Sequence, residues 1–452
     1  MSLKVLLIFH SNTDKKVSIE KLPPLGILSI ASYLEKMGIH TDVIDFTIDP
    51  KAQIRAEEYD LIGFSINISN REISLKEILN IKNKYPEKRI VVGGPLCLSN
   101  PDLFALNEYI DAVFVCEGEH ALYEYITFQN KDAVKGIFYR RETEMVYTGD
   151  RPWIDNLDSL PFPAFNKVNL KKYNNFPKKK RPLSSMITSR GCPYNCIFCS
   201  HSMGKKWRPR SAENVAKEIM WQISEFGVKE ILIYDDNFSL NRKRAEKICD
   251  LIVEQKLKIK IQFSNGLRAD NLDLSLLKKI KKAGTWLMGI APEVGNPEVM
   301  KKIKKGFDHK KVIEIRELCR KVGIKTHGFF MIGFPFENKN TIKDTINFAK
   351  KIDCEIVEFN KVIPYAKTEL YDLLIKHNNL LEDPITNVKS YHEGTIITHK
   401  VGELKDSEIK ELIRKAYREY YLRPRKMIDL LKTFSFADLL GLSLYAIRTR
   451  NI

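Results

Sequence analysis

Short apolar runs alternate with helix-like segments along most of this chain, and this alternation limits the possible folds more than any other feature. Residues 3–9, Leu-Lys-Val-Leu-Leu-Ile-Phe, indicate a buried strand. We predict further strands at 41–46, 61–66, 89–92 and 112–115, separated by helices at 25–37, 70–84, 101–108 and 119–127. Strands that alternate with helices form parallel sheets. The first third is therefore predicted to be a doubly wound, Rossmann-like α/β domain, which binds ligands beyond the carboxyl ends of its strands.

A second alternation follows between residues 183 and 380. Predicted strands lie at 186–189, 230–234, 260–264, 286–290, 325–331 and 355–359. The helix after the first of these strands is the clearest, because Val215, Ile219, Ile223 and Phe226 recur on one face. Ser211 can cap its start and Gly227 can end it. The pattern predicts a second parallel α/β domain with its chemistry at the carboxyl ends of the strands.

The segment between the two alternations reads as a linker. Residues 153–165, Trp-Ile-Asp-Asn-Leu-Asp-Ser-Leu-Pro-Phe-Pro-Ala-Phe, contain two prolines within three residues, which stop regular structure. We predict four parts: a first domain at 1–145, a linker at 146–182, a second domain at 183–395 and a helical region at 396–452.

The amino-acid composition limits the cellular compartment and the kinds of binding partner that we expect. Lys and Arg number 74 and Asp and Glu 57, which gives the 452-residue chain a formal net charge of +17. Such a balance can indicate nucleic acid, anionic lipid or an acidic substrate. Without a compact patch of arginine and aromatic residues we predict a lysine-rich surface and no nucleic acid partner. With scattered cysteines and no signal peptide at Met-Ser-Leu-Lys, we expect a cytoplasmic protein.

Three of the eight cysteines stand together. Cys192, Cys196 and Cys199 have the spacing C-x3-C-x2-C, which puts three thiols in one loop. Iron–sulfur cubanes are normally held by four cysteines, so three suggest a cluster with one open iron. Two alternatives stay open at this point. His201 lies two residues further on and allows a Cys3His zinc site, and free thiols are common in protein cores.

The cysteine motif, with Phe198 before its last cysteine, resembles the signature of the radical S-adenosylmethionine (SAM) superfamily. This resemblance implies a partial (β/α) barrel that carries a [4Fe-4S] cluster on Cys192, Cys196 and Cys199. The open iron would chelate SAM, and Phe198 would lie beside its adenine. An electron from a donor such as ferredoxin or flavodoxin would then cleave SAM to a 5′-deoxyadenosyl radical.

Further polar residues follow the predicted strands at positions where the superfamily binds SAM. Asp235 and Asp236 follow the second strand and are expected near the SAM amino group, as an acidic residue near an amine should be. Arg268 is expected to reach the SAM carboxylate or the substrate, and Glu293 the ribose hydroxyls or the amino group. The alternative for the aspartates is an ordinary role at the barrel rim.

The first domain resembles the cobalamin-binding domain that precedes many radical SAM enzymes. The likeness rests on Leu-Pro-Pro-Leu-Gly at 22–26, Tyr-Asp-Leu-Ile-Gly-Phe-Ser at 59–65, Gly-Gly-Pro at 93–95 and Cys-Glu-Gly-Glu at 116–119. It implies cobalamin contacts for His10, Ser65, Gly93, Gly94 and Glu117. A D-x-H-x-x-G motif is absent, so no histidine is expected to bind cobalt. The alternative is a Rossmann-like domain without a cofactor.

Together these likenesses indicate a class B radical SAM methyltransferase, which would methylate an unactivated carbon of a small molecule or lipid with the help of cobalamin. The same architecture supports radical cyclisation or rearrangement without methyl transfer. A non-catalytic iron–sulfur or zinc module is the alternative from another class.

Residues 434–447 form an apolar segment flanked by Lys432, Arg448 and Arg450. We expect this segment to pack on the barrel or to make peripheral membrane contact, because it is too short to span a bilayer.

Overall fold

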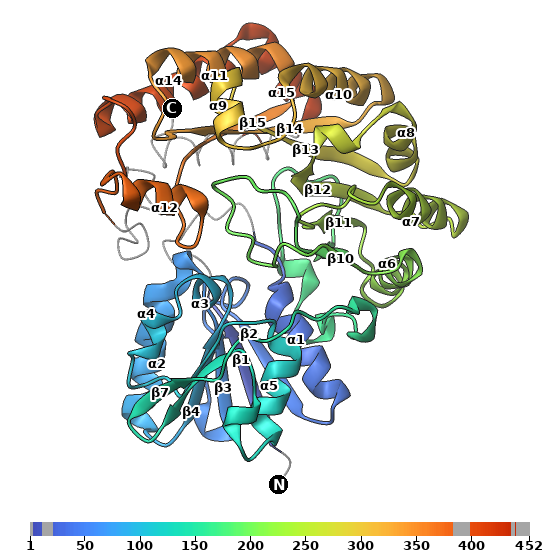
Figure 1. Ribbon diagram of the computed structural model, residues 1–452. Coiled ribbons are helices and arrows are strands. Elements are labelled where there is room, and N and C mark those ends of the chain that lie inside the picture. The colour runs from blue at the N-terminus through green and yellow to red at the C-terminus, as the bar shows by residue number, and fades with distance from the viewer. Residues whose placement is uncertain (1–2, 11–20, 383–397, 435–438, 440–452) are drawn as a thin grey trace. The chain divides into compact units, whose positions relative to one another are not determined.

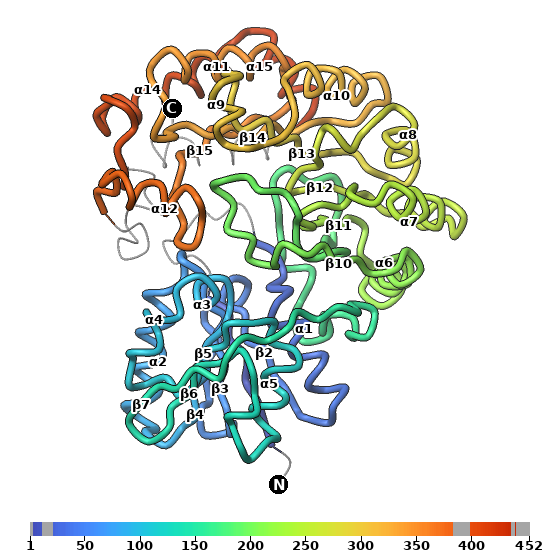
Figure 2. Tube along the Cα trace, viewed as in Figure 1, coloured from blue at the N-terminus to red at the C-terminus, as the bar shows by residue number. Residues whose placement is uncertain are grey.

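Two sheets organise the chain, one in each of the units Met1–Asn174 and Asn175–Ile452 into which it divides. The computed structural model describes residues 3–10, 21–382, 398–434 and 439. Figure 1 draws the elements of both units, and Figure 2 follows the chain path through them. Within the described residues, no helix has both the length and the apolar character needed to cross a membrane.

The first unit has a seven-stranded sheet in the order β2-β1-β3-β4-β5-β6-β7. Its strands are β1 Lys4–Phe9, β2 His40–Asp45, β3 Leu61–Ser65, β4 Arg89–Gly93, β5 Ala112–Phe114, β6 Ile137–Arg141 and β7 Glu144–Tyr147. The first five strands pair in parallel, as the alternation predicted. The doubly wound α/β fold of this unit is therefore confirmed.

Helices cover both faces of this sheet (Figure 1). They are α1 Leu25–Lys36, α2 Arg71–Lys84, α3 Pro95–Ser99, α4 Asp102–Ala105 and α5 Gly118–Thr127. Pro24 precedes α1 and Gly38, at φ +83°, follows it, so the chain turns where the sequence indicated. Ile27, Ala31 and Leu34 of α1 are buried in the core against Val5 and Leu7 of β1.

Two features of this unit differ from the prediction. Strands β6 and β7 were not predicted, and they add an antiparallel hairpin to the sheet beyond β5. The half-exposed pattern of these strands lacks the continuous apolar runs by which the central strands were found. The helix predicted at 101–108 is also shorter than predicted, because α4 ends at Ala105, and the short helix α3 before it was not predicted.

The segment predicted as a linker packs largely on the first unit through short 3₁₀ helices at Leu157–Ser159, Phe165–Lys167 and Leu170–Lys172. Ile154, Leu157 and Leu160 form a buried cluster with Tyr33 of α1. The hydroxyl of Tyr173 donates to Asp45 at 2.6 Å, and Lys21 and Asn174 form an isolated β-bridge. We call residues 150–174 the strap.

The second unit has a six-stranded parallel sheet in the order β15-β14-β13-β12-β11-β8. Its strands are β8 Leu183–Met186, β11 Glu230–Ile233, β12 Lys260–Leu267, β13 Thr285–Glu293, β14 Lys325–Ile332 and β15 Ile356–Lys361. Successive strands are neighbours, as in an open (β/α) barrel. Five of the six strands lie where the sequence predicted them. The first begins three residues earlier than predicted and is followed by a small antiparallel pair, β9 Ser189–Arg190 with β10 Arg208–Pro209.

Figure 1 draws the helices of the second unit, and most of them lie along the outer side of the sheet. They are α6 Ala212–Phe226, α7 Arg242–Glu254, α8 Leu274–Lys282, α9 Pro297–Lys302, α10 His309–Val322, α11 Lys339–Ile352, α12 Glu369–Lys376, α14 Asp406–Tyr421 and α15 Pro424–Thr433, with a 3₁₀ turn at Ala269–Asn271. Ser211 caps α6 by accepting from Asn214 N, and Gly227 ends it at φ +63°, which confirms both predictions.

The described part of the carboxyl-terminal region packs on the second sheet. Phe434 joins a buried cluster with Trp286, Leu287 and Ile356. Most of the apolar segment predicted at 434–447 lies outside the described residues.

Candidate functional site

The three cysteines lie in one loop between β9 and β10, beyond the carboxyl end of the first strand of the second sheet. The backbone of Cys192 donates to Gly204 O at 3.1 Å, and that of Cys199 to Cys196 O at 3.1 Å. Ile197, between the cysteines, is 2% exposed and anchors the loop in an apolar cluster. The loop is therefore fixed at the end of the sheet where barrels of this kind carry their chemistry.

Backbone contacts hold the middle of the loop from two other elements. Ile197 N donates to Ile303 O at 3.2 Å, and Leu370 N of α12 donates to Ile197 O at 2.9 Å. Gly191, just before the first cysteine, has φ +84°, and a Cβ at this position would collide with the carbonyl oxygen of Lys206. Only glycine fits where the loop leaves β9.

The surroundings of the thiols suit an anionic cluster. Burial raises the pKa of Cys192 and raises that of Cys199 to about 11, so both thiols favour the protonated form when no metal binds them. Arg268 acts in the opposite direction on Cys192, and Lys305 interacts electrostatically with Cys196. Soft sulfur ligands with buried cations nearby match the donor set that iron–sulfur clusters use.

A single metal ion would need its ligands to converge on one point. Within the residues that the structure describes, no group of three or more His, Cys, Asp or Glu side chains is arranged to hold one ion. In a four-iron cluster each thiolate binds a different iron, so its ligands stand further apart. His201, the fourth ligand considered for zinc, has its Nε2 2.7 Å from the carbonyl oxygen of Tyr194.

Both aspartates after β11 contact the segment that leads into the cysteine loop. Asp235 is 3% exposed and accepts from Thr188 N and Thr188 Oγ1, each at 2.5 Å, and from Ser189 Oγ at 2.6 Å. Asp236 accepts from Gly191 N at 2.9 Å, and burial raises its pKa. These contacts assign Asp235 to holding the loop, and a contact of either carboxylate with the SAM amino group stays a prediction.

Arg268 is packed against the cysteine loop. Its guanidinium carbon lies 3.4 Å from the ring centroid of Tyr194, which stands between the first two cysteines. The same guanidinium forms an ion pair with Asp270 at 2.9 Å and donates to Lys305 O at 2.9 Å. Arg268 therefore braces the loop, and its predicted contact with the SAM carboxylate or substrate is untested.

Glu293 forms a buried ion pair that the sequence did not reveal. Its Oε1 is 2.6 Å from the Nζ of Lys305, and both residues are less than 9% exposed. Glu293 also has φ +67°, a strained conformation for a residue with a side chain. The cation of Lys305 lies 6.0 Å from the ring centroid of Phe198. This pair is held next to the residues expected to surround SAM.

Phe198 meets the Gly-Phe-Pro turn that follows β14. Its ring packs edge-on against Phe334, with 5.7 Å between the centroids. Glu337 orders this turn by accepting from Gly333 N at 2.7 Å and from Phe334 N at 2.8 Å. Burial raises the pKa of Glu337 to about 7. The two aromatic residues thus form one surface.

In the first unit, the predicted cobalamin contacts lie at the carboxyl end of the parallel strands. Ser65 and Gly93 are register partners at the ends of β3 and β4, so no large side chain projects from this pair. Gly94 has φ +104°, and a Cβ there would lie 2.8 Å from Ile66 O. Small residues at a sheet edge leave room for a ligand, which fits the predicted cofactor.

Two of the residues predicted to contact cobalamin already contact other residues of the first unit. His10 is 4% exposed and stacks on Phe46 with 4.4 Å between the ring centroids, and burial lowers its pKa to about 4. Glu117 Oε2 accepts from Ile154 N of the strap at 2.6 Å. These contacts give both residues structural roles, and cobalamin binding by any of the five predicted residues stays a prediction.

Sequence reasoning missed Lys305, Glu337 and Tyr194. Lys305 lies in the run Lys304-Lys305-Gly306, where nothing distinguishes a buried lysine from an exposed one. Glu337 follows the Gly-Phe-Pro turn by two residues, and its position just beyond a glycine–proline turn was a usable signal. Tyr194 was visible inside the cysteine motif, but its partner Arg268 is distant in sequence.

Comparison with known proteins agrees with this architecture. The family model for the radical SAM superfamily matches residues 186–349, and the model for the B12 binding domain matches residues 17–126. The chain is 31% identical to an uncharacterized methyltransferase, PH0819, of Pyrococcus horikoshii over 94% of each chain. It is 25% identical to cytidylyl-2-hydroxyethylphosphonate methyltransferase of Streptomyces wedmorensis over 93% of this chain and 90% of the relative.

A solved structure has the same fold. The methyltransferase TsrM of Kitasatospora setae, with cobalamin and a [4Fe-4S] cluster bound, matches with a TM-score of 0.68 and 18% identity. The match covers 83% of this chain and 78% of TsrM. The chain therefore belongs to the radical SAM superfamily, in the group that carries a B12-binding domain ahead of the radical SAM domain.

Proposed function

We propose that this protein is a cobalamin-dependent radical SAM methyltransferase that acts on an unactivated carbon. The observation that carries this proposal is the order of the two domains in a chain that resembles methyltransferases along nearly its whole length. The substrate is proposed to be a small molecule or a lipid. The electron is proposed to come from a donor protein such as ferredoxin or flavodoxin.

The second unit would bind the cluster and SAM. Cys192, Cys196 and Cys199 would hold three irons of a [4Fe-4S] cluster and leave the fourth for SAM. When bound, the cluster supplies the electron that cleaves SAM to a 5′-deoxyadenosyl radical. Phe198 and Phe334 offer an apolar surface of the kind an adenine ring stacks on. Asp236 and the Glu293–Lys305 pair offer charges for the polar end of SAM.

The first unit would bind cobalamin at the carboxyl end of its parallel strands. Ser65, Gly93 and Gly94 would line this position because they are small, while His10 and Glu117 shape the edge from within. When bound, cobalamin supplies the methyl group that is transferred. The sequence lacks the motif that provides a histidine to cobalt, so the protein would hold the corrinoid without a ligand of its own.

Two products of SAM test the proposal separately. The chain is produced without oxygen in cells supplied with cobalamin, and its iron and cobalt are measured. We expect about four irons and one cobalt per chain. With a reductant and SAM, 5′-deoxyadenosine reports radical formation, and S-adenosylhomocysteine reports removal of the methyl group. Wild-type protein is expected to form both products, and Cys192→Ala to lose 5′-deoxyadenosine.

The control for the thiol chemistry is Cys249→Ala, which changes a buried cysteine of α7 outside the loop. It should keep the iron and both products. Formation of 5′-deoxyadenosine without cobalt or S-adenosylhomocysteine would replace methyl transfer by a radical rearrangement or cyclisation. Zinc in place of iron would end the proposal.

A further inference from the structure

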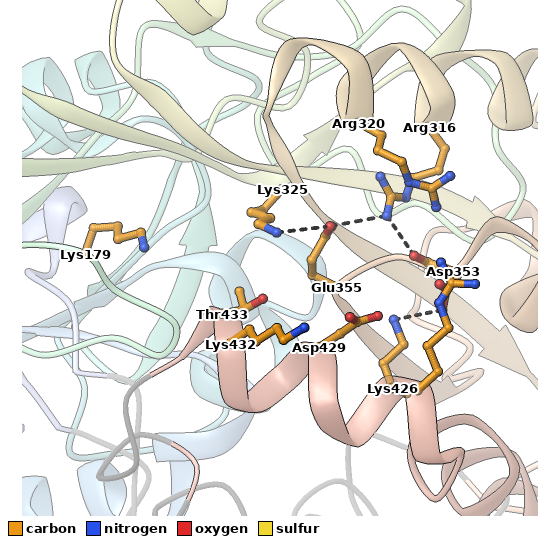
Figure 3. Close-up of a pocket in the computed structure, with 11 residues that line it drawn as sticks. Lys179, Arg316, Arg320, Lys325, Asp353, Glu355, Lys426, Asp429, Lys432 and Thr433 are labelled. Atoms are coloured by element: carbon orange, nitrogen blue, oxygen red, sulfur yellow. Dashed lines mark hydrogen bonds and ion pairs between the residues drawn. The ribbon is translucent and has the colours of Figure 1, made fainter.

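A cavity of about 360 Å³ lies at the opposite end of the second sheet from the cysteine loop. Lys325 begins β14 and Glu355 directly precedes β15, so the cavity opens at the amino-terminal edge of the strands. Figure 3 shows α10 on one side, with Arg316 and Arg320 projecting from it, and α15 on the other. The volume falls in the range of small-molecule sites, about 300–1,000 Å³.

Positive charge dominates this cavity. Seven of its eleven lining residues are Lys or Arg and three are Asp or Glu; the cationic residues are Lys179, Arg316, Arg320, Lys325, Arg425, Lys426 and Lys432. Two of the carboxylates already have cationic partners. Asp353 pairs with Arg423 and Lys426, each at 2.8 Å, and Glu355 pairs with Arg316 at 3.3 Å and with Lys325 at 3.7 Å. The lining therefore has an excess of four positive charges, the difference between its seven cationic and three acidic residues.

Arg316 provides the most specific observation. This residue is 3% exposed, and its Nη2 donates to Asp353 O at 2.8 Å and approaches Glu355 Oε1 at 3.3 Å. Its Nε and Nη1 are buried and have no hydrogen-bond partner among the residues that the structure describes. Buried guanidinium donors without acceptors are unfavourable. An anion in the cavity would supply those acceptors.

The pKa of a neighbouring lysine also reflects the positive charge around the cavity. Lys281, which donates to Gly323 O at 2.5 Å, has its pKa lowered first by burial and then by Lys260, Lys325 and Lys179. Two of these three cations line the cavity. The lysines at this edge of the sheet therefore repel one another, and an anion bound among them would reduce that repulsion.

We propose that this cavity binds a phosphate group carried by a larger molecule. Phosphate offers several oxygens and more than one negative charge, which suits a buried arginine beside several lysines better than a single carboxylate would. The cavity has room for the group that carries the phosphate. In (β/α) barrels this end of the strands is not where catalysis occurs, so the site would dock or regulate. The proposal does not depend on the chemistry proposed for the cysteine loop.

Two sources of the phosphate group fit this position. One is a soluble phosphorylated compound. The other is a phospholipid headgroup, because α15 exposes Met427, Ile428 and Leu431 by 51%, 51% and 64%. A helix with basic and exposed apolar residues suits the surface of an anionic membrane. The two sources share the same pocket chemistry and are separated by the experiment.

The test measures binding of two kinds of probe to the full chain. Inorganic phosphate, pyrophosphate and glycerol phosphate are titrated by calorimetry at constant ionic strength. Phosphatidylcholine vesicles with or without phosphatidylglycerol are used in sedimentation. The decisive variant is Arg320→Gln with Lys432→Gln, because both residues line the cavity on separate helices. Lys310→Gln with Lys243→Gln removes the same charge from exposed positions outside the cavity and is the matched control.

We expect the double variant to weaken binding about tenfold or more, and the control to change it less than about twofold. A loss seen with soluble phosphates identifies a phosphorylated small molecule, and a loss seen only with anionic vesicles identifies a lipid headgroup. Absence of binding to every probe, or equal weakening by both double variants, would overturn the proposal. Arg316→Lys serves as a second variant, which keeps the charge but removes the unpaired donors, and should also weaken binding.

Discussion

The buried pair of Lys305 and Glu293 places two opposite charges beside the cysteine loop. Removing one partner of such a pair leaves an isolated buried charge, which typically costs about 3–5 kcal/mol. We therefore expect Lys305→Met to lower the free energy of unfolding by that amount, as measured by denaturant titration of the second unit. Lys304→Met is the neighbouring control, because its exposed pair with Glu369 should contribute less than about 1 kcal/mol.

A double variant shows whether the loss of stability comes from breaking the Glu293–Lys305 pair or from the change of side chain alone. Adding Glu293→Gln to Lys305→Met removes the unpaired carboxylate and should restore a large part of the lost stability. If the two losses simply add, the two side chains do not stabilise each other and the assignment fails.

Glu337 introduces a dependence of stability on pH. Its pKa rises from 4.5 to about 7 on folding because the carboxyl is buried, so the folded state binds more protons than the unfolded state between these values. Stability should fall as the pH rises through this window, by an amount on the order of 3 kcal/mol. Glu337→Gln keeps an acceptor for Gly333 N and Phe334 N without the charge, so its unfolding should depend less on pH.

The measurement compares unfolding of both proteins at about pH 5 and about pH 8, on either side of this pKa window. Relative to wild type, Glu337→Gln should gain stability at the higher pH. Glu298→Gln, an exposed position on α9, should follow the wild type at both. Parallel pH curves for wild type and Glu337→Gln would contradict the buried state of this carboxyl.

At the candidate site, the sequence could place residues but not their partners. The cysteine spacing and the turns after each strand are local signals, and the parallel sheet brings them to one edge. The contacts of Asp235 with Thr188 and Ser189 join residues nearly fifty positions apart, so no local pattern reports them. For this reason the sequence did not reveal that Asp235 holds the loop, and the contact with SAM predicted for it stays a prediction.

At the scale of elements, α14 covers the open edge of the second sheet. The hydroxyl of Tyr421 bonds to both Val357 N and Val357 O, at 2.8 and 2.7 Å, and that of Tyr417 accepts from Phe359 N at 3.1 Å. The spacing of four on the helix matches the spacing of two on β15. These tyrosines take the place of a neighbouring strand on an edge that would otherwise expose unpaired backbone groups.

Loss of these hydroxyls should weaken the edge strand. Tyr421→Phe keeps the ring but leaves the two backbone groups of Val357 without their partner, at a cost of about 1–3 kcal/mol. Amide hydrogen exchange at Val357 and Phe359 should accelerate, and the melting temperature should fall. Tyr147→Phe, whose hydroxyl contacts Asp150 on the surface of the first unit, should leave exchange in β15 unchanged. Unchanged exchange in Tyr421→Phe would show that α14 does not protect this edge.

The burial of each strand and helix explains which elements can be predicted well from the sequence. Central strands such as β1 and β4 are buried on both faces and read as apolar runs. The hairpin of β6 and β7 is partly exposed, so it lacks a continuous apolar run. The sequence of α14 reads like that of any polar helix, and the contact of its tyrosines with β15 can be seen only in the assembled sheet. Periodicity finds elements that bury one continuous face and misses those that complete an edge.

At the scale of the whole molecule, the strap decides where the first unit ends. The sequence put a boundary at residue 145, but Ile154, Leu157 and Leu160 pack against Tyr33, and Glu117 bonds to Ile154 N. Further along, Lys167 forms an ion pair with Glu35 at 2.6 Å. A domain that ended at residue 145 would lose all of these contacts. We therefore propose that the first domain extends to residue 174.

Two truncated chains test this boundary. Residues 1–174 should fold alone and unfold cooperatively, because the unit keeps its sheet and strap. Residues 1–145 should be unstable, since the chain loses fully buried Tyr173 and with it the hydrogen bond that Tyr173 donates to the buried Asp45. Each large buried side chain contributes about 3–5 kcal/mol against a total stability of about 5–15 kcal/mol. Circular dichroism and thermal melting distinguish the two, and equal stability would return the boundary to residue 145.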